Sequence, residues 1–193
     1  MPQSSPDALL SVEQRLVRLE ARVAIRELIA RYCFAVDERD LDGIRDCFAR
    51  DGIMRSLDGV MNARGREAVI EQFHGRFAVL GPSNHYTHDH LIEFDGADGT
   101  RARGTLNTHA EVVRNGEFLL AALRYHDRYV LEEGCWRFAE RALAFFYYAR
   151  PADLPAIMAD TLRNRAYAAP MAADFPESSP HWQAYYRDRP RRR

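Results

Sequence analysis

Residues 21–52 read ARVAIRELIARYCFAVDERDLDGIRDCFARDG, and this stretch decides the fold expected for the chain. Its apolar residues recur every three or four positions, which is typical of an amphipathic helix. Ser11 and Gln14 match a capping box, so the helix is expected to begin beside them. A shorter helix is expected from about Asp40, with Asp51–Gly52 as its end.

The pattern changes from helix to strand in the second half of the chain. A third helical pattern precedes Gly81–Pro82, which is expected to end it; its apolar residues are Val69, Ile70, Phe73 and Phe77. Over residues 84–148 apolar and polar residues alternate, and the turn signals DGADG, RNGE and EEGC divide this stretch into about four antiparallel strands. One expected strand face holds Leu119, Ala121, Leu123, Tyr125 and Tyr129.

This order of elements predicts the α+β class, with a curved mixed or antiparallel sheet wrapped around the long N-terminal helix. Residues 1–150 are expected to form one domain, and residues 151–193 a proline-rich C-terminal extension that packs on it or covers an opening. Phe118 and Leu120 place apolar side chains on the second face of the sheet. That face needs a partner, so a homodimer or homotrimer is expected.

Composition limits the classes of partner. The 193 residues include 27 basic and 28 acidic ones, so no overall field draws the chain to nucleic acid or to a membrane surface. Cys33, Cys47 and Cys135 are well separated and lie in apolar contexts, which favours buried reduced thiols and a cytoplasmic location. No P-loop, glycine-rich dinucleotide motif or serine nucleophile elbow is present.

The stretch SNHYTHDHLIEFDG, residues 83–96, brings His85, His88 and His90 close together in sequence. A zinc site needs three or four converging ligands, and a regular strand would direct His88 and His90 to one face and His85 to the other. Neither a metal nor another cofactor is therefore expected. A bulge between residues 86 and 91 would reset the two faces.

Four segments in this order resemble the SnoaL-like branch of the nuclear transport factor 2-like superfamily: residues 21–52, NARGREAVIEQF, HYTHDHLIEF and YHDRYVLEEGCWRFAERAL. The resemblance runs from about residue 10 to residue 150. Lyases of this branch include hexachlorocyclohexane dehydrochlorinase, bile acid 7α-dehydratase and scytalone dehydratase. The superfamily also contains isomerases, cyclases, oxygenase small subunits and proteins without known activity.

The resemblance implies a catalytic pair formed by Asp37 and His85, at the end of the first helix and the start of the following strand. The carboxylate would orient the imidazole, and the imidazole would take a proton from the substrate. Tyr32 would assist the leaving group, although its spacing from Val36 also suits a core aromatic residue. Asp37 can equally be read as a simple helix-terminal carboxylate. Strict alternation favours His88 over His85, whereas the resemblance favours His85.

Two positions depart from the family pattern. Ala110 stands where a further acidic residue is expected, with His109 beside it on what is otherwise a polar strand face. A shift of one residue would bring His109 into the pocket, where it is expected to bind substrate together with Tyr86 and Tyr125. No Lys or Arg aligns with the basic residues of the dehydrochlorinase, which makes loss of chloride the less expected elimination.

The sequence thus favours a cofactor-independent lyase, and more narrowly a dehydratase, acting on a hydrophobic cyclic or polycyclic small molecule. A ketosteroid-isomerase-like isomerase or a cyclase is the nearest alternative enzyme. A non-catalytic small-molecule binder or an oxygenase small subunit is the alternative from another class.

Overall fold

The computed structural model describes residues 10–96 and 98–189. Three helices precede most of the sheet: α1 (Val12–Glu38), α2 (Leu41–Cys47) and α3 (Arg66–Phe77). The Ser11 hydroxyl accepts the backbone N–H of Gln14, whose side chain accepts the N–H of Ser11, so the expected capping box is confirmed.

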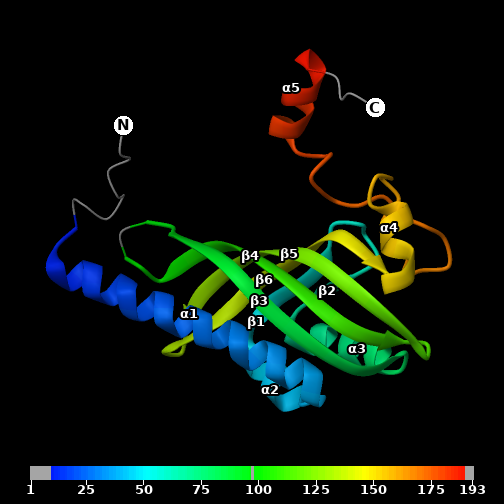
Figure 1. Ribbon diagram of the computed structural model, residues 1–193. Coiled ribbons are helices and arrows are strands. Elements are labelled where there is room, and N and C mark those ends of the chain that lie inside the picture. Colours follow the sequence, from blue (N-terminus) through cyan, green and yellow to red (C-terminus); the bar gives the residue numbers. More distant parts are fainter. Residues whose placement is uncertain (1–9, 97, 190–193) are drawn as a thin grey trace.

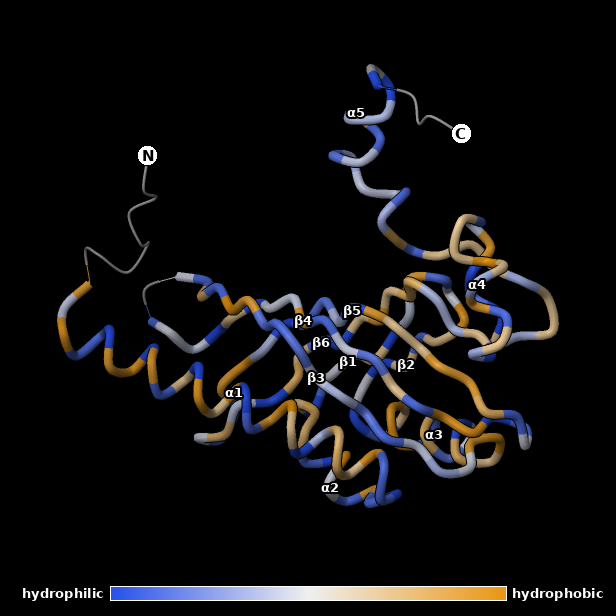
Figure 2. The backbone as a smooth tube through the Cα atoms, in the orientation of Figure 1, coloured by the Kyte–Doolittle hydropathy of each residue, from blue (hydrophilic) through white to orange (hydrophobic). Residues whose placement is uncertain are grey.

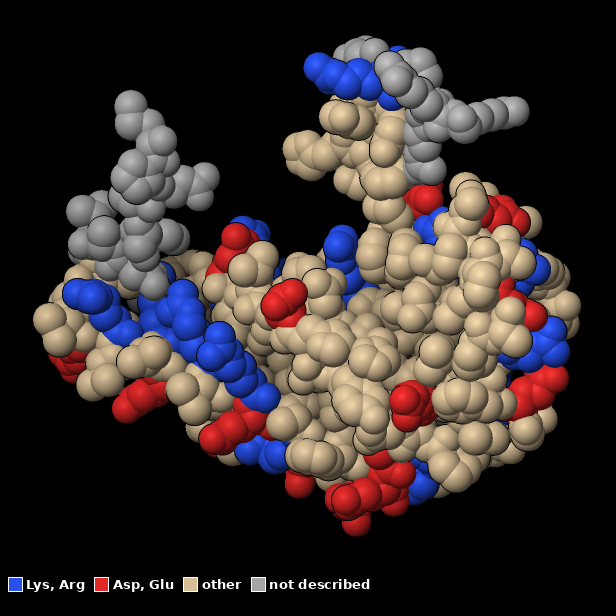
Figure 3. All heavy atoms as spheres, in the orientation of Figure 1, with Lys and Arg blue, Asp and Glu red and all other residues tan. Residues whose placement is uncertain are grey.

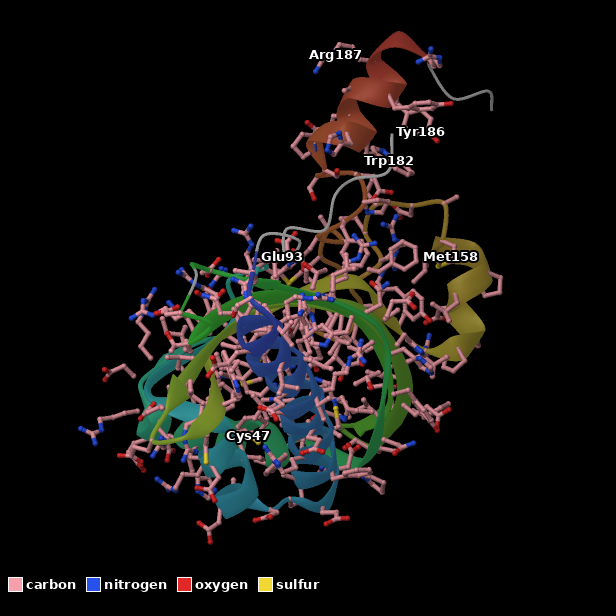
Figure 4. The ribbon with its side chains drawn as sticks, turned by 90° about the vertical axis from the view of Figure 1, so that its left-hand side faces the viewer. Cys47, Glu93, Met158, Trp182, Tyr186 and Arg187 are labelled. Carbon is pink, nitrogen blue, oxygen red and sulfur yellow. The ribbon has the colours of Figure 1, made fainter. Side chains whose placement is uncertain are left out.

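Six strands form one curved sheet: β1 (Phe48–Ser56), β2 (Asn62–Arg64), β3 (Leu80–Phe94), β4 (Arg101–Arg114), β5 (Glu117–Glu132) and β6 (Cys135–Ala149). Their order is β2-β1-β6-β5-β4-β3, and all neighbours are antiparallel except β1 and β6. Figure 1 shows α1 running across this sheet, and Figure 4 shows the sheet curving around the side chains of the interior. The expected α+β class with a curved mixed sheet is confirmed.

Two details of the expected order were wrong. Strands were expected only within residues 84–148, whereas β1 and β2 precede α3, and Asp51–Gly52 lies within β1 at a register shift instead of ending a helix. Likewise α3 ends at Phe77, and Gly81–Pro82 belongs to β3. Proline is tolerated there because β3 is an edge strand, on which one row of backbone N–H groups has no partner strand.

The core lies between the inner face of the sheet and the helices. Helix α1 contributes Ile25, Leu28, Ile29, Tyr32 and Val36, and β4 contributes Ala102 and Leu106. Burying an aliphatic side chain of this size stabilises the fold by about 1.5–3 kcal/mol. Figure 2 shows the apolar segments of α1 facing the sheet along its C-terminal half. Packing on this inner face holds the end of α1 against β3.

The C-terminal extension follows β6 with η1 (Pro151–Asp153), α4 (Leu154–Ile157) and α5 (Pro180–Asp188). Asn164 forms a bridge to Tyr148 on β6, and the Phe175 ring stacks on Phe146 with centroids 5.6 Å apart. Figures 1 and 4 show α5, with Trp182 and Tyr186, standing away from the sheet. The extension therefore contacts the body through its first part.

Two further sequence expectations can be compared with the structure. Cys33 and Cys47 are buried free thiols, but Cys135 is exposed because it opens β6 directly after the β5–β6 turn. In the part of the chain that the structure describes, no helix combines the length and the apolar character that crossing a membrane requires.

Candidate functional site

Strand β3 has two register shifts against β4, and the one between Thr87 and His90 decides which histidine faces the interior. Thr87 pairs with Thr108 and His90 pairs with Leu106, so three steps along β3 oppose two along β4. The extra residue is a bulge, and it falls inside the range 86–91 in which the sequence allowed for one. His85, opposite the buried Ala110, consequently faces inward, and so does His90 beyond the bulge.

Asp37 and His85 meet where the last turn of α1 crosses β3. The imidazole Nδ1 of His85 lies 2.6 Å from Oδ1 of Asp37, and the backbone N–H of His85 donates to Oδ2 over 2.8 Å. Their side chains are 10% and 13% exposed. The structure thus brings the two residues together with two contacts between them, and it leaves both side chains within reach of solvent.

The carboxylate is held from the other side by a relay of donors. Ser83 donates its hydroxyl to Asp37 Oδ1 over 2.8 Å, and Arg39 Nη1 donates to the Ser83 hydroxyl over 3.0 Å. Arg39 is the left-handed C-cap of α1 and also donates to the Gly81 carbonyl. Through these bonds the end of α1 and the start of β3 fix the position of the carboxylate.

This geometry determines the proton on the imidazole. Burial raises the pKa of Asp37, but hydrogen bonds from His85 and Ser83 outweigh that effect and lower the pKa overall. Because the carboxylate is ionised, Nδ1 must be the donor in the 2.6 Å contact. In the neutral ring Nε2 then carries the lone pair, and within residues 10–96 and 98–189 it has no hydrogen-bond partner. The pair can therefore act as a proton acceptor.

Tyr32 and Tyr125 lie in the aromatic core behind this pair. The Tyr32 ring contacts two other rings edge-on, with ring centroids 6.4 Å from Tyr125 and 5.5 Å from Phe138. Tyr32 is 1% exposed. Burial raises the pKa of both phenols. On α1, Tyr32 lies about 140° around the helix axis from Asp37. Its surroundings are those of a core aromatic residue, and a role for its phenol at Asp37 and His85 stays a prediction.

Sequence reasoning missed a buried cation, Arg141. Its guanidinium is completely buried and forms a two-point ion pair with Asp127, at 3.0 Å and 2.7 Å. It also lies over the Tyr32 and Tyr125 rings at 4.3 Å and 4.0 Å, while its Nη1 has no partner. Burial opposes the charge, but Asp127 more than compensates and raises the pKa of Arg141. Buried N–H groups without a partner are uncommon in native structures.

Asp127 carried a signal that the sequence analysis passed over. The expected inner face of β5 runs through Leu119, Ala121, Leu123, Tyr125 and Tyr129, and Asp127 continues the same alternation. A carboxylate on a core face needs a cationic or hydrogen-bonding partner. The register places Asp127 directly beside Arg141 on β6.

His90 faces the interior, on the same side as His85, whereas a regular strand would have grouped it with His88. Its Nε2 lies 3.2 Å from the hydroxyl of Tyr129, which donates to Asp127 over 2.9 Å. Burial lowers the pKa of His90 to about 4, and its Nδ1 is buried without a partner. His90 therefore extends the Arg141–Asp127 pair into a polar network within the core.

The expected substrate-binding residues Tyr86 and His109 lie on the other face of the sheet. Tyr86 on β3 and His109 on β4 are paired and point outward, and their rings stack with centroids 4.8 Å apart. His88 joins them, with its Nε2 2.8 Å from Nδ1 of His109. The expectation that Tyr86 and His109 share a pocket with His85 is corrected, because the one-residue shift that it required is absent from this part of β4.

Two hollows on the described surface lie away from Asp37 and His85. One of about 620 Å³ is bordered by charged residues, among them Arg50, Arg101 and Glu132. Another, of about 530 Å³, lies on the outer face beside His88 and His109. In residues 10–96 and 98–189, no group of three or more His, Cys, Asp or Glu side chains is arranged to hold a metal ion.

Comparisons with known proteins address the fold. Residues 17–142 match the family model of the SnoaL-like domain. No curated protein sequence matches the chain. Hexachlorocyclohexane dehydrochlorinase, LinA, superposes with a TM-score of 0.66 at 22% identity, over 72% of this chain and 95% of LinA.

Two further solved structures are similar. A scytalone dehydratase-like protein of Novosphingobium aromaticivorans superposes with a TM-score of 0.65 at 19% identity, over 85% of this chain and 96% of its own. A protein of unknown function from Mycobacterium tuberculosis superposes with a TM-score of 0.59 at 28% identity, over 67% of this chain and 78% of its own. Since the family model matches well over half of its residues, the chain belongs to the SnoaL-like domain family of the nuclear transport factor 2-like superfamily.

Proposed function

We propose that this protein is a lyase, and specifically a dehydratase, that acts on a hydrophobic cyclic or polycyclic small molecule. The observation that carries the proposal is the 2.6 Å contact between His85 Nδ1 and Asp37, because it leaves Nε2 of the neutral ring available to accept a proton. The dehydrochlorinase and dehydratase-type neighbours support the reaction class.

In the proposed reaction, His85 Nε2 takes a proton from a carbon next to an activating carbonyl group. The electrons of that C–H bond form a carbon–carbon double bond, and the hydroxyl on the neighbouring carbon leaves. The proton required to release it as water comes from the imidazolium or from the Tyr32 phenol. Asp37 stabilises the imidazolium and keeps its ring in place. General-base catalysis of this kind contributes about 10²- to 10⁴-fold in rate.

In this proposal Arg141 stabilises the negative charge that develops during the reaction. Its unpartnered Nη1 can donate to the oxygen on which negative charge develops, and the low-polarity surroundings strengthen that interaction. The same cation also suits a departing halide, so elimination of a halide is the second candidate. The absence of an aligned basic residue had disfavoured loss of chloride, and this second candidate assigns the basic role to Arg141.

The proposal is tested by incubating the purified protein with a panel of cyclic β-hydroxy ketones and their β-chloro analogues in deuterated water. Mass spectrometry distinguishes loss of water, loss of hydrogen chloride, and deuterium uptake without loss of mass. Loss of water that disappears in the His85→Ala variant supports the dehydratase. Deuterium uptake alone would favour the isomerase alternative, and an unreactive panel with tight ligand binding would favour a binding protein.

A further inference from the structure

Helix α1 has a second apolar face, on the side away from its own sheet. Val12, Leu16, Leu19 and Val23 follow one another at spacings of four, three and four residues and are 79%, 53%, 58% and 51% exposed. Ala21, buried against the core, lies about half a turn around the helix from them. Scattered apolar residues on a surface need no explanation, but four in a row along one helix face are typical of a contact surface.

Charged residues border this apolar stripe in an ordered way. If Leu16 and Val23 are assigned to heptad position a, then Val12 and Leu19 take position d. The e positions are then all glutamate (Glu13, Glu20 and Glu27), and the g positions are both arginine (Arg15 and Arg22). Figure 3 shows one row of basic and one row of acidic side chains along α1, with uncharged atoms between them.

Arg15 and Glu20 are not placed to stabilise α1 itself. Opposite charges support a helix when they are three or four residues apart. Neither Arg15 nor Glu20 has an opposite charge at either spacing, and both are exposed. Their arrangement instead matches the flanking positions of paired helices, where e and g residues of different helices meet.

We propose that the outward face of α1 binds the same face of a second copy of this chain, with the two helices parallel. In a parallel pair each g residue meets the e residue five positions later on the other helix. Arg15 then meets Glu20 of the second copy, twice per pair. An antiparallel pair would instead oppose Arg to Arg and Glu to Glu. The charge pattern therefore selects both the partner and the orientation.

The geometry of the chain fits this pairing. The core face of α1 points away from the stripe, so the two sheets lie on opposite sides of the paired helices. Because α1 is already folded on its own sheet, association does not have to form the helix. Arg26 occupies the next d position and ends the stripe, and Arg22 lies over Phe94 at 4.9 Å. Arg15 with Glu20 is consequently the main ion pair.

Sedimentation equilibrium across a range of protein concentrations tests the surface. Replacing Leu16→Ser and Leu19→Ser together should weaken self-association at least about tenfold, since apolar area is lost from both copies. Leu91→Ser is the matched control, because Leu91 is 73% exposed on the outer face of β3. A wild-type chain that stays monomeric, or a double variant that associates as the wild type does, would overturn the proposal.

Charge reversal tests the orientation. Arg15→Glu and Glu20→Arg should each weaken self-association, because each places like charges opposite one another in a parallel pair. Mixing the two variants should restore association, since every g residue then meets an opposite charge. Restored association in the mixture supports the parallel pair. Stronger self-association of either single variant would show an antiparallel pair and refute the assignment.

Discussion

The two faces of β3 present histidines in two different settings. On the inner face, His85 Nδ1 lies 2.6 Å from the carboxylate of Asp37; on the outer face, His88 Nε2 lies 2.8 Å from another imidazole, that of His109. The distances are similar, but the partners differ in charge. A carboxylate stabilises a protonated imidazole, whereas two imidazoles joined by one hydrogen bond share one proton and lose that bond when both are charged. Partner chemistry, more than proximity, distinguishes a candidate base from a surface pair.

The largest expected effect separates these two histidines. His85→Ala should lower kcat by about 10²- to 10⁴-fold, because it removes the proton acceptor. His88→Ala should leave kcat within about twofold of the wild-type value, because His85 is the only general base in the proposed reaction. Steady-state kinetics on a substrate from the proposed panel measures both, and circular dichroism checks that each variant is folded. The reverse result, with His88 essential and His85 dispensable, would place the base on the outer face.

The second prediction compares the buried ion pair on the inner face of the sheet with an exposed ion pair on its outer face. Asp127→Ala should lower the free energy of unfolding by about 3–5 kcal/mol, because it leaves the Arg141 guanidinium buried without its counter-charge. Glu93→Ala breaks the exposed pair with Arg103, at 2.8 Å, and should have a much smaller effect because water solvates both groups. Urea unfolding measures both. Equal losses in the two variants would contradict the account of the buried pair.

The third prediction concerns His90 and pH. Its folded-state pKa of about 4 lies below the ordinary value of about 6.5, so the unfolded chain binds more protons between these pH values. The contribution of His90 to stability is therefore present above about pH 6.5 and is lost as pH falls toward 4. After allowance for solvent screening, the loss is on the order of 1 kcal/mol.

Thermal unfolding between pH 4 and pH 7 measures this effect. His90→Gln should reduce the acid-side loss of stability relative to the wild type, since glutamine does not titrate. His88→Gln on the outer face is the matched control. If both variants keep the wild-type pH dependence, titration of His90 does not contribute to acid stability.

The smallest expected effect is that of metal removal. Exhaustive chelation should change neither the rate nor the midpoint of thermal unfolding, because His85 and His88 face opposite sides of the sheet and do not converge on one ion. Activity and Tm are compared before and after treatment. A loss that added zinc restores would contradict this expectation.

Helical spacing and strand alternation were sufficient to predict the architecture. The capping box at Ser11, the long helix and the four consecutive strands after residue 80 all follow from local pattern. Strand β1 was missed because it follows α2 directly and contains the turn-like Asp51–Gly52 pair. Its pairing with β6 depends on residues far along the chain, which local pattern does not report.

The candidate site was less accessible to sequence reasoning. A family resemblance led to Asp37 and His85, but alternation alone would have selected His88, because a bulge cannot be located from residue types. Alternation alone puts Asp127 on the core face of β5, but its partner Arg141 becomes evident only when the register places the two side by side. Three-dimensional pairing therefore decides which charged residues enter the interior.

The bulge at residues 88–89 makes the phases of β3 before and after it independent of one another. His85 lies before the bulge, and the partly buried Ile92 and Phe94, which pack against the core, lie after it. A length change at the bulge would leave the pairing of His85 with Ala110 intact, whereas one between residues 83 and 85 would separate His85 from Asp37. In homologous chains, insertions and deletions are accordingly expected to be tolerated at residues 88–89 and excluded a few residues earlier.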